Sequence, residues 1–184
     1  MKKTSLLLLL IVLFSTQFYG QRFITKTGHI FFYSEAPMET IEAHNKQVNA
    51  AIDTQTGDMV FKVLMKSFIF EKALMQEHFN ENYVESDKFP NATFKGKVTN
   101  LDEIDFSKTG KYPAIVEGSL TIHGKSNPVK AKGEFIIEED LIHSTSKFKI
   151  EIADYDISIP GAVTGKISEE IEITIDVKLK EYKK

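Results

Sequence analysis

Strict alternation of apolar and polar residues is the feature that most limits what this chain can fold into. Between positions 171 and 179, isoleucine, valine and leucine occupy every odd position, and Glu172, Thr174, Asp176 and Lys178 occupy the even ones. A period of two places successive side chains on opposite faces of a strand, so that one face is buried and the other is solvated. This segment is therefore predicted to be a half-buried β-strand.

The same pattern recurs along the chain after residue 21. Alternating apolar faces begin with Ile30 and Phe32 and continue at 48–52, 61–65, 94–98, 116–122, 129–137 and 148–152. Turn-forming residues separate several of these segments, as at 53–58, 123–128 and 138–140. Because closure of a sheet removes its exposed edges, the pattern predicts an all-β fold, an eight-stranded antiparallel barrel, with a sandwich as the other arrangement considered.

One segment departs from the alternation. Between 71 and 84, Leu74, Met75, Phe79 and Tyr83 recur at helical spacing, with polar residues on the opposite side. This spacing predicts an amphipathic helix inserted between two strands. A helix in that position packs over one end of a barrel, where it either gates the interior or acts as a plain structural cap.

The chain ends and the overall charge limit the cellular setting. Lys2 and Lys3 precede an apolar run from 6 to 14, which fits an export signal and is too short to span a bilayer. We expect residues 1–20 to be removed after Gly20, leaving 21–184 as one domain that is periplasmic or secreted and has no stable membrane anchor. Loss of the two lysines changes the formal charge from −3 to −5, which argues against nucleic acid as a partner. The absence of cysteine excludes disulfides, thiol catalysis and a lipoprotein anchor.

The inward faces of the predicted strands carry no Asp, Glu, Lys or Arg and contain many small residues. The small residues are Ala50, Ala92, Gly96, Ala114, Gly118, Ala131 and Gly133. An eight-stranded barrel is either filled by side chains or holds one ligand. Small residues favour an open lumen, but they also permit strand coiling and close backbone approach, and both interpretations stay open. An open lumen within long strands fits an apolar, chain-like ligand.

The predicted ligand-binding residues are the apolar residues of the inward strand faces together with those of the helix. They are Phe32, Val48, Phe61, Val63, Met65, Leu74, Phe79, Phe94, Val116, Gly118, Leu120, Ala131, Phe135, Phe148, Ile150, Ile173 and Ile175.

Motifs of catalysis and metal binding are not found in the sequence. None of the five histidines forms an H-x-H, H-x-x-H or H-E-x-x-H spacing, so no metal site and no cofactor are predicted. By parity His123 is expected to face outward, and His78 to be half-buried on the apolar side of the helix. No nucleophile elbow, P-loop or dinucleotide fingerprint occurs, so the chain is predicted not to be an enzyme.

Three segments resemble a known family. FPNATF at 89–94 matches an FP-x-x-TF strand opening, and VEGSLTIHG at 116–124, followed by Pro128 and Val129, matches a V-x-G-x-L-T-x-x-G…PV hairpin. Tyr155-Asp156-Ile157 stands in the place of an aromatic-Gly-Ile step. On these segments the chain resembles the YceI-like family, whose members are exported lipocalin-like barrels that bind polyisoprenoids or isoprenoid quinones. The resemblance implies an isoprenoid-like lipid as the partner and supplies no catalytic residues.

The sequence departs from the family pattern at one place that concerns the ligand. Many members carry an arginine shortly before the aromatic-Gly-Ile step, and residues 152–154 offer none, while Asp156 replaces the glycine. The resemblance thus supports an apolar tail and not a charged head group. Two alternatives remain: a filled barrel that serves as an envelope stress or protein-interaction module, and an enzyme that uses His78. The oligomeric state stays open, with a dimer as one possibility.

Overall fold

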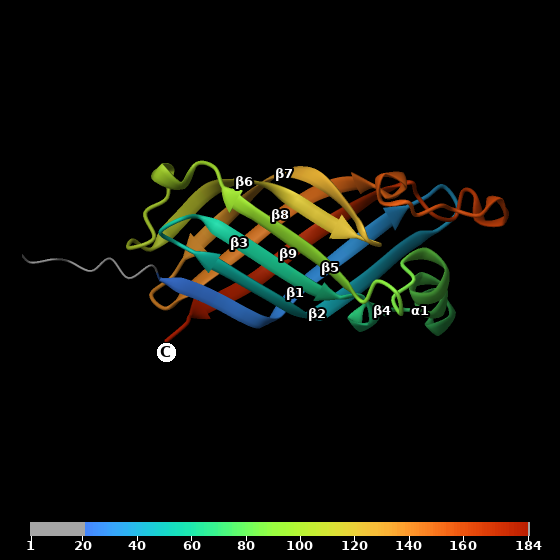
Figure 1. Cartoon of the computed structure of the whole chain (residues 1–184), viewed down its shortest axis with the longest axis horizontal. Helices are drawn as coiled ribbons and strands as arrows, with labels where there is room; N and C mark the ends of the chain where they lie inside the picture. The colour runs from blue at the N-terminus through green and yellow to red at the C-terminus, as the bar shows by residue number, and fades with distance from the viewer. Residues whose placement is uncertain (1–20, 184) are drawn as a thin grey trace, which may run out of the picture.

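The computed structural model describes residues 21–183, and there nine strands form a single antiparallel sheet that closes on itself (Figure 1). The strands are β1 (Arg22–Glu35), β2 (Thr40–Asp53), β3 (Asp58–Leu64), β4 (Ile69–Phe70), β5 (Asn91–Val98), β6 (Gly110–Ile122), β7 (Lys125–Ile137), β8 (Leu141–Glu151) and β9 (Glu170–Glu181). Eight strands follow the order β1-β9-β8-β7-β6-β5-β3-β2, and β2 returns to pair with β1. The two-residue β4 pairs with β2 only. The predicted eight-stranded antiparallel barrel is confirmed.

Alternation along the strands sets the interior of the barrel. In the β1–β9 register, Ile30 pairs with Ile175 and Phe32 pairs with Ile173, so inward residues of neighbouring strands lie side by side. Side chains of the intervening positions, such as Phe31 and Thr174, lie on the outer wall. The apolar face of each strand therefore points into one common lumen.

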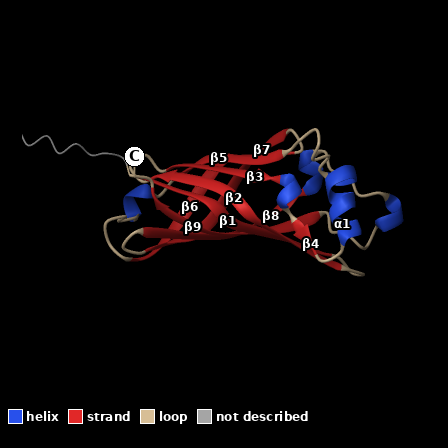
Figure 2. Ribbon diagram, turned by 90° about the horizontal axis from the view of Figure 1, so that it is seen from below, coloured by secondary structure: helices blue, strands red, loops and turns tan. Residues whose placement is uncertain are grey.

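The two ends of the barrel differ (Figure 2). At one end the segment 65–90, which we call the cap, contains η1 (Met65–Ser67), β4, α1 (Ala73–His78) and a π-helical turn, η2 (Phe79–Tyr83). The connection between β8 and β9 adds η4 (Ile152–Tyr155) and η5 (Gly161–Val163) at the same end. At the other end are η3 (Leu101–Glu103) and the C-terminus.

The helix predicted over 71–84 exists, but it is shorter than expected and is completed by the π-helical turn. Leu74, on the apolar side of the predicted helix, is 59% exposed. No residue of α1 is fully buried, and His78 is exposed, so the prediction of a half-buried His78 was wrong. Farther along the same apolar side, Phe79 and Tyr83 of η2 pack against the core.

The end of the barrel opposite the cap is filled by side chains. Val48, Phe135, Ile142, Val177 and Leu179 are each at most 1% exposed. These five side chains come from β2, β7, β8 and β9 and pack in the core. The lumen is thus closed at this end by a dry core of ordinary packing.

Two of the small inward residues permit close backbone approach and do not widen the lumen. Gly96 and Gly118 pair across β5 and β6. A Cβ built on Gly118 would lie 2.5 Å from the Gly96 Cα and 2.6 Å from the ring of Phe94. The Phe94 ring therefore covers the glycine pair.

We predict that Gly118→Ala lowers the free energy of unfolding by about 1–3 kcal/mol, because the added methyl overlaps backbone that cannot move freely. Gly161→Ala is the control, since nothing lies within 4 Å of a Cβ at that position. Denaturant unfolding of both variants measures the difference, and equal midpoints would contradict the account of the glycine pair.

Candidate functional site

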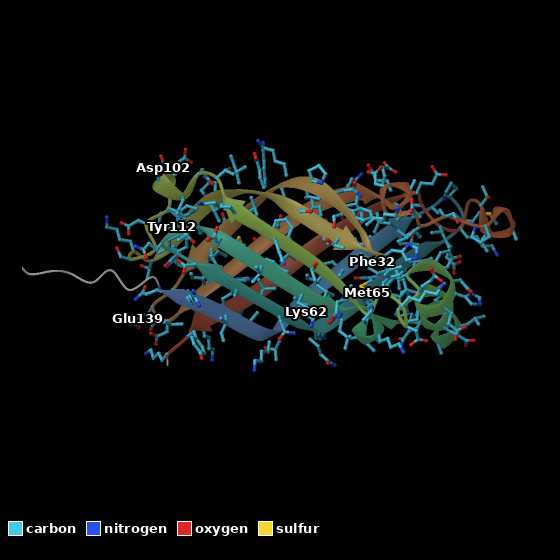
Figure 3. All side chains as sticks on the ribbon, viewed as in Figure 1. Phe32, Lys62, Met65, Asp102, Tyr112 and Glu139 are labelled. Atoms are coloured by element: carbon cyan, nitrogen blue, oxygen red, sulfur yellow. The ribbon has the colours of Figure 1, made fainter. Side chains whose placement is uncertain are left out.

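A cavity of about 480 Å³ occupies the cap half of the lumen. Its lining comes from β1–β3 and β5–β9, from the cap, and from the 152–167 connection. Phe32 and Met65, two lining residues, lie toward the α1 end, whereas Asp102, Tyr112 and Glu139 mark the opposite end (Figure 3). The volume falls within the range of roughly 300–1,000 Å³ typical of small-molecule pockets. The barrel is therefore filled at one end and hollow at the other.

Four phenylalanine rings join the barrel wall to the cap at the mouth of the cavity. Phe79 of the π-helical turn lies with its ring centroid 5.7 Å from Phe32 of β1, 5.7 Å from Phe68 and 5.0 Å from Phe70. Phe32 also contacts Phe68 and Phe70, at 5.4 and 5.9 Å. These separations lie in the range at which aromatic pairs attract. The cap is thus held over the lumen by apolar contacts.

Charged side chains line the cavity only at its mouth. Glu39, from the β1–β2 connection, lies 2.8 Å from the ammonium of Lys72, which immediately precedes α1. The hydrogen bond to Glu39 raises the pKa of Lys72. Lys166 and His78 are the other basic side chains in the lining. Among the lining residues that belong to strands, none carries a charge.

The few polar groups that the strands contribute to the lining are hydroxyls. Ser34 is buried, and its Oγ accepts a hydrogen bond of 2.8 Å from the Ser168 N–H. Ser146 donates to the Lys132 carbonyl oxygen at 2.8 Å. Ser144 is buried further along β8. A wall of this kind excludes ions and accepts hydrocarbon.

Most of the residues predicted for ligand contact line the cavity. The structure brings together Phe32, Phe61, Val63, Met65, Leu74, Phe79, Phe94, Val116, Leu120, Ala131, Phe148, Ile150, Ile173 and Ile175. Three do not line it: Val48 and Phe135 belong to the filled end, and Gly118 lies beneath the Phe94 ring. The alternation shows which side chains point inward, but it does not show how far along a strand the lumen is filled.

Several lining residues lie outside the predicted set. Phe68 and Phe70 follow the turn η1, which interrupts the alternation of β3 and shifts its parity. Ile157, Val163 and Ile167 come from the irregular connection between β8 and β9. Phe68, Ile69 and Phe70 form a continuous apolar run, so no alternation in the sequence marked which of them face inward. No periodic signal exists for the other three.

His123 ties the cap to the barrel and is not the outward-facing residue that parity predicted. It adopts φ 50° in the β6–β7 turn, and its side chain is only 13% exposed. Nδ1 lies 3.0 Å from the Tyr155 carbonyl oxygen, and Nε2 lies 2.9 Å from a Glu85 carboxylate oxygen. Both partners accept, so the ring satisfies both bonds when both nitrogens are protonated. Hydrogen bonds from Lys88 and then from His123 lower the pKa of Glu85.

Groups suited to a tightly held metal or to a membrane span are not found within residues 21–183. There, no three His, Cys, Asp or Glu side chains converge in a way that would hold a metal ion. In the same range, no helix is both long and apolar enough to cross a bilayer.

The sequence model of the YceI-like domain matches residues 22–179. No curated protein matches significantly. Among solved structures, a polyisoprenoid binding domain from Saccharophagus degradans superposes with a TM-score of 0.76 at 13% identity, covering 88% of this chain and 98% of that one.

Two further structures share the fold. Burkholderia cenocepacia BcnA gives a TM-score of 0.67 at 16% identity and covers 83% of this chain and 95% of its own. A Campylobacter jejuni YceI protein gives 0.59 at 19% identity, covering 77% and 85%. These likenesses establish a common barrel architecture.

We predict that His123→Ala detaches the cap locally and lowers the free energy of unfolding by about 1–3 kcal/mol, because the buried Tyr155 carbonyl loses its partner. His78→Ala is the matched control, since His78 is exposed and makes no hydrogen bond of this kind. Hydrogen exchange of residues 79–89 measures the local effect. Unchanged exchange in His123→Ala would show that the apolar contacts of the cap suffice alone.

Proposed function

Because the chain belongs to the YceI-like family, we propose that it is an exported protein that binds one apolar, chain-like lipid of the polyisoprenoid or isoprenoid-quinone type in the cavity. The observation that carries this proposal is a closed-ended cavity whose strand-borne lining has no charge. The Saccharophagus degradans structure of the same fold is a polyisoprenoid binding domain, which supports the same class of ligand.

Burial of hydrocarbon alone supplies the affinity that such a carrier needs. Each buried methylene contributes about 0.8 kcal/mol. Micromolar binding corresponds to about 8 kcal/mol, to which the loss of freedom on association adds about 4 kcal/mol or more. A chain of a few isoprene units therefore binds at this level without a specific polar contact.

The distribution of charge orients the lipid. Its tail occupies the apolar lumen, and its head group remains at the mouth beside Glu39, Lys72 and Lys166. The ammonium of Lys72 is already engaged by Glu39, and the arginine of many family members has no counterpart at 152–154. A neutral head group therefore fits this mouth better than an anionic one.

The proposal assigns binding and no chemical step to the cavity. The polar groups that the strands contribute to it are hydroxyls, of which Ser34 and Ser146 already make hydrogen bonds to backbone groups. Neither histidine at this end is buried within the lumen. His123 holds the cap to the barrel, and His78 is exposed at the rim. Export rests on the sequence of residues 1–20, which lie outside the described residues.

We predict that Ala131→Phe weakens the uptake of a prenyl lipid at least tenfold, because the new ring occupies the lumen that the ligand needs. Ala131 lines the cavity on β7. Ala51→Phe is the matched control, because it places the same ring on the outward-facing side of β2, between the inward-facing Ala50 and Ile52.

Fluorescence titration with a polyprenyl probe, together with thermal melting, measures binding and stability separately. Equal uptake by both variants, each melting as the wild type does, would contradict the proposed function.

A further inference from the structure

The connection between β8 and β9 contains an uncharged loop at the cap end of the molecule. This loop, ISIPGAVTG at 157–165, carries no charge in a chain of which 27% is charged, so it differs from the rest of the surface. Pro160, Gly161 and Ala162 are exposed, and nothing lies within 4 Å of a Cβ built on Gly161. Figure 1 shows the connection, in orange, extending beyond the ends of the strands.

A second uncharged loop lies beside the first. Residues 36–38, Ala-Pro-Met, lie between β1 and β2. The Met38 N–H donates a hydrogen bond of 2.9 Å to the Gly165 carbonyl oxygen, which holds the two loops together. The Met38 side chain is 70% exposed. We refer to the two segments, 36–38 and 157–165, as the tip.

The tip borders the mouth of the cavity. Val163 of the tip lines the cavity, and so do Glu39 and Lys166, which directly follow the two segments. Leu74 of α1 is another lining residue and is 59% exposed. A flat partner that covers the tip therefore also faces the opening of the cavity.

The backbone of the tip supplies several of its own hydrogen bonds. The Val163 N–H donates to the Pro160 carbonyl oxygen at 3.0 Å, and the Thr164 N–H donates to the Gly161 carbonyl oxygen at 3.3 Å. The bond between the two loops adds a third. Unsatisfied N–H and C=O groups are what makes irregular backbone costly in an apolar layer. The tip therefore enters the boundary of such a layer at a lower cost than an open loop does.

Exposed apolar surface of this kind marks a site of contact with a protein or with a membrane. We propose that the tip docks into the surface of a phospholipid bilayer, so that the cavity mouth faces the lipids. This inference rests on the proposed function, because an apolar lipid carried in the cavity is exchanged with a bilayer, and that exchange favours a bilayer over a protein as the partner.

The charges next to the tip favour a bilayer without net charge. Glu35 and Glu39 flank the first loop, and Asp156 and Lys166 flank the second. Lys72 is engaged by Glu39. Acidic residues outnumber basic ones at these positions, so attraction to anionic lipids does not supply the attachment. Burial of apolar side chains at the interface supplies it, and such attachment is reversible.

Vesicles of phosphatidylcholine that contain no prenyl lipid test the docking separately from ligand binding. We expect the full mature chain to sediment with these vesicles, and added salt to leave the binding unchanged. The combined variant Met38→Glu/Ala162→Glu should weaken vesicle binding at least tenfold, because both carboxylates resist entry into the apolar layer. Neither residue lines the cavity, so titration with the polyprenyl probe should match that of the wild type.

Tyr182→Glu is the matched control, because Tyr182 is an exposed apolar side chain next to the C-terminus, at the opposite end of the barrel. It should bind vesicles as the wild type does. Since the chain has no cysteine, a polarity-sensitive fluorophore can also be placed on Ala162→Cys or on Tyr182→Cys. Vesicles should shift the emission of the first label to the blue and leave the second unchanged.

Wild-type protein that does not bind the vesicles, or binds them only through charge and is released by salt, would overturn the docking even if the probe titration succeeds. Equal vesicle binding by the combined variant, or an equal loss in Tyr182→Glu, would overturn it as well. Vesicle binding through the tip without any uptake of the probe would support the docking and contradict the proposed function. Circular dichroism of each variant verifies that the barrel is intact.

Discussion

Pairing between β1 and β2 is the constraint on which the rest of the structure depends, because it closes an eight-stranded sheet whose ends would otherwise be open edges. Closure turns one face of every strand toward a common lumen. The residues on that face must therefore be apolar in every strand. The same closure lets the two ends differ. At one end Val48, Phe135, Val177 and Leu179 fill the lumen, whereas at the other the walls enclose a cavity. A filled end supplies core packing to a chain without disulfides, and the hollow end remains available for binding.

The cap explains how one end stays hollow without collapsing. Phe79 packs against Phe32 of the wall and against Phe68 and Phe70, so the aromatic groups span the mouth without filling the space below. His123 fastens the far side of the cap to the β6–β7 turn through Glu85. Within the cap, Met65, Phe68 and Val84 are buried, whereas α1 buries no residue completely. A segment with so little buried surface as α1 opens at a lower free-energy cost than the strands beneath it.

Much of the fold was readable from the sequence, because alternation at a period of two determines both strand identity and inward parity. Twelve of the predicted contact residues that line the cavity were predicted from this alternation, and Leu74 and Phe79 were predicted from helical spacing. Parity says nothing about depth, so Val48 and Phe135 were assigned to the lumen although they fill its closed end. It also fails in turns: His123 has a positive φ, and its ring points into the cap and not into solvent.

The central claim is that the cavity holds an apolar chain in the functioning protein. Native mass spectrometry of the protein, purified gently from its own host and then extracted with organic solvent, tests it most directly. The account predicts a bound mass that is released by extraction as a prenyl chain or a quinone. A clean ligand-free mass that does not shift after incubation with prenyl lipids would contradict it.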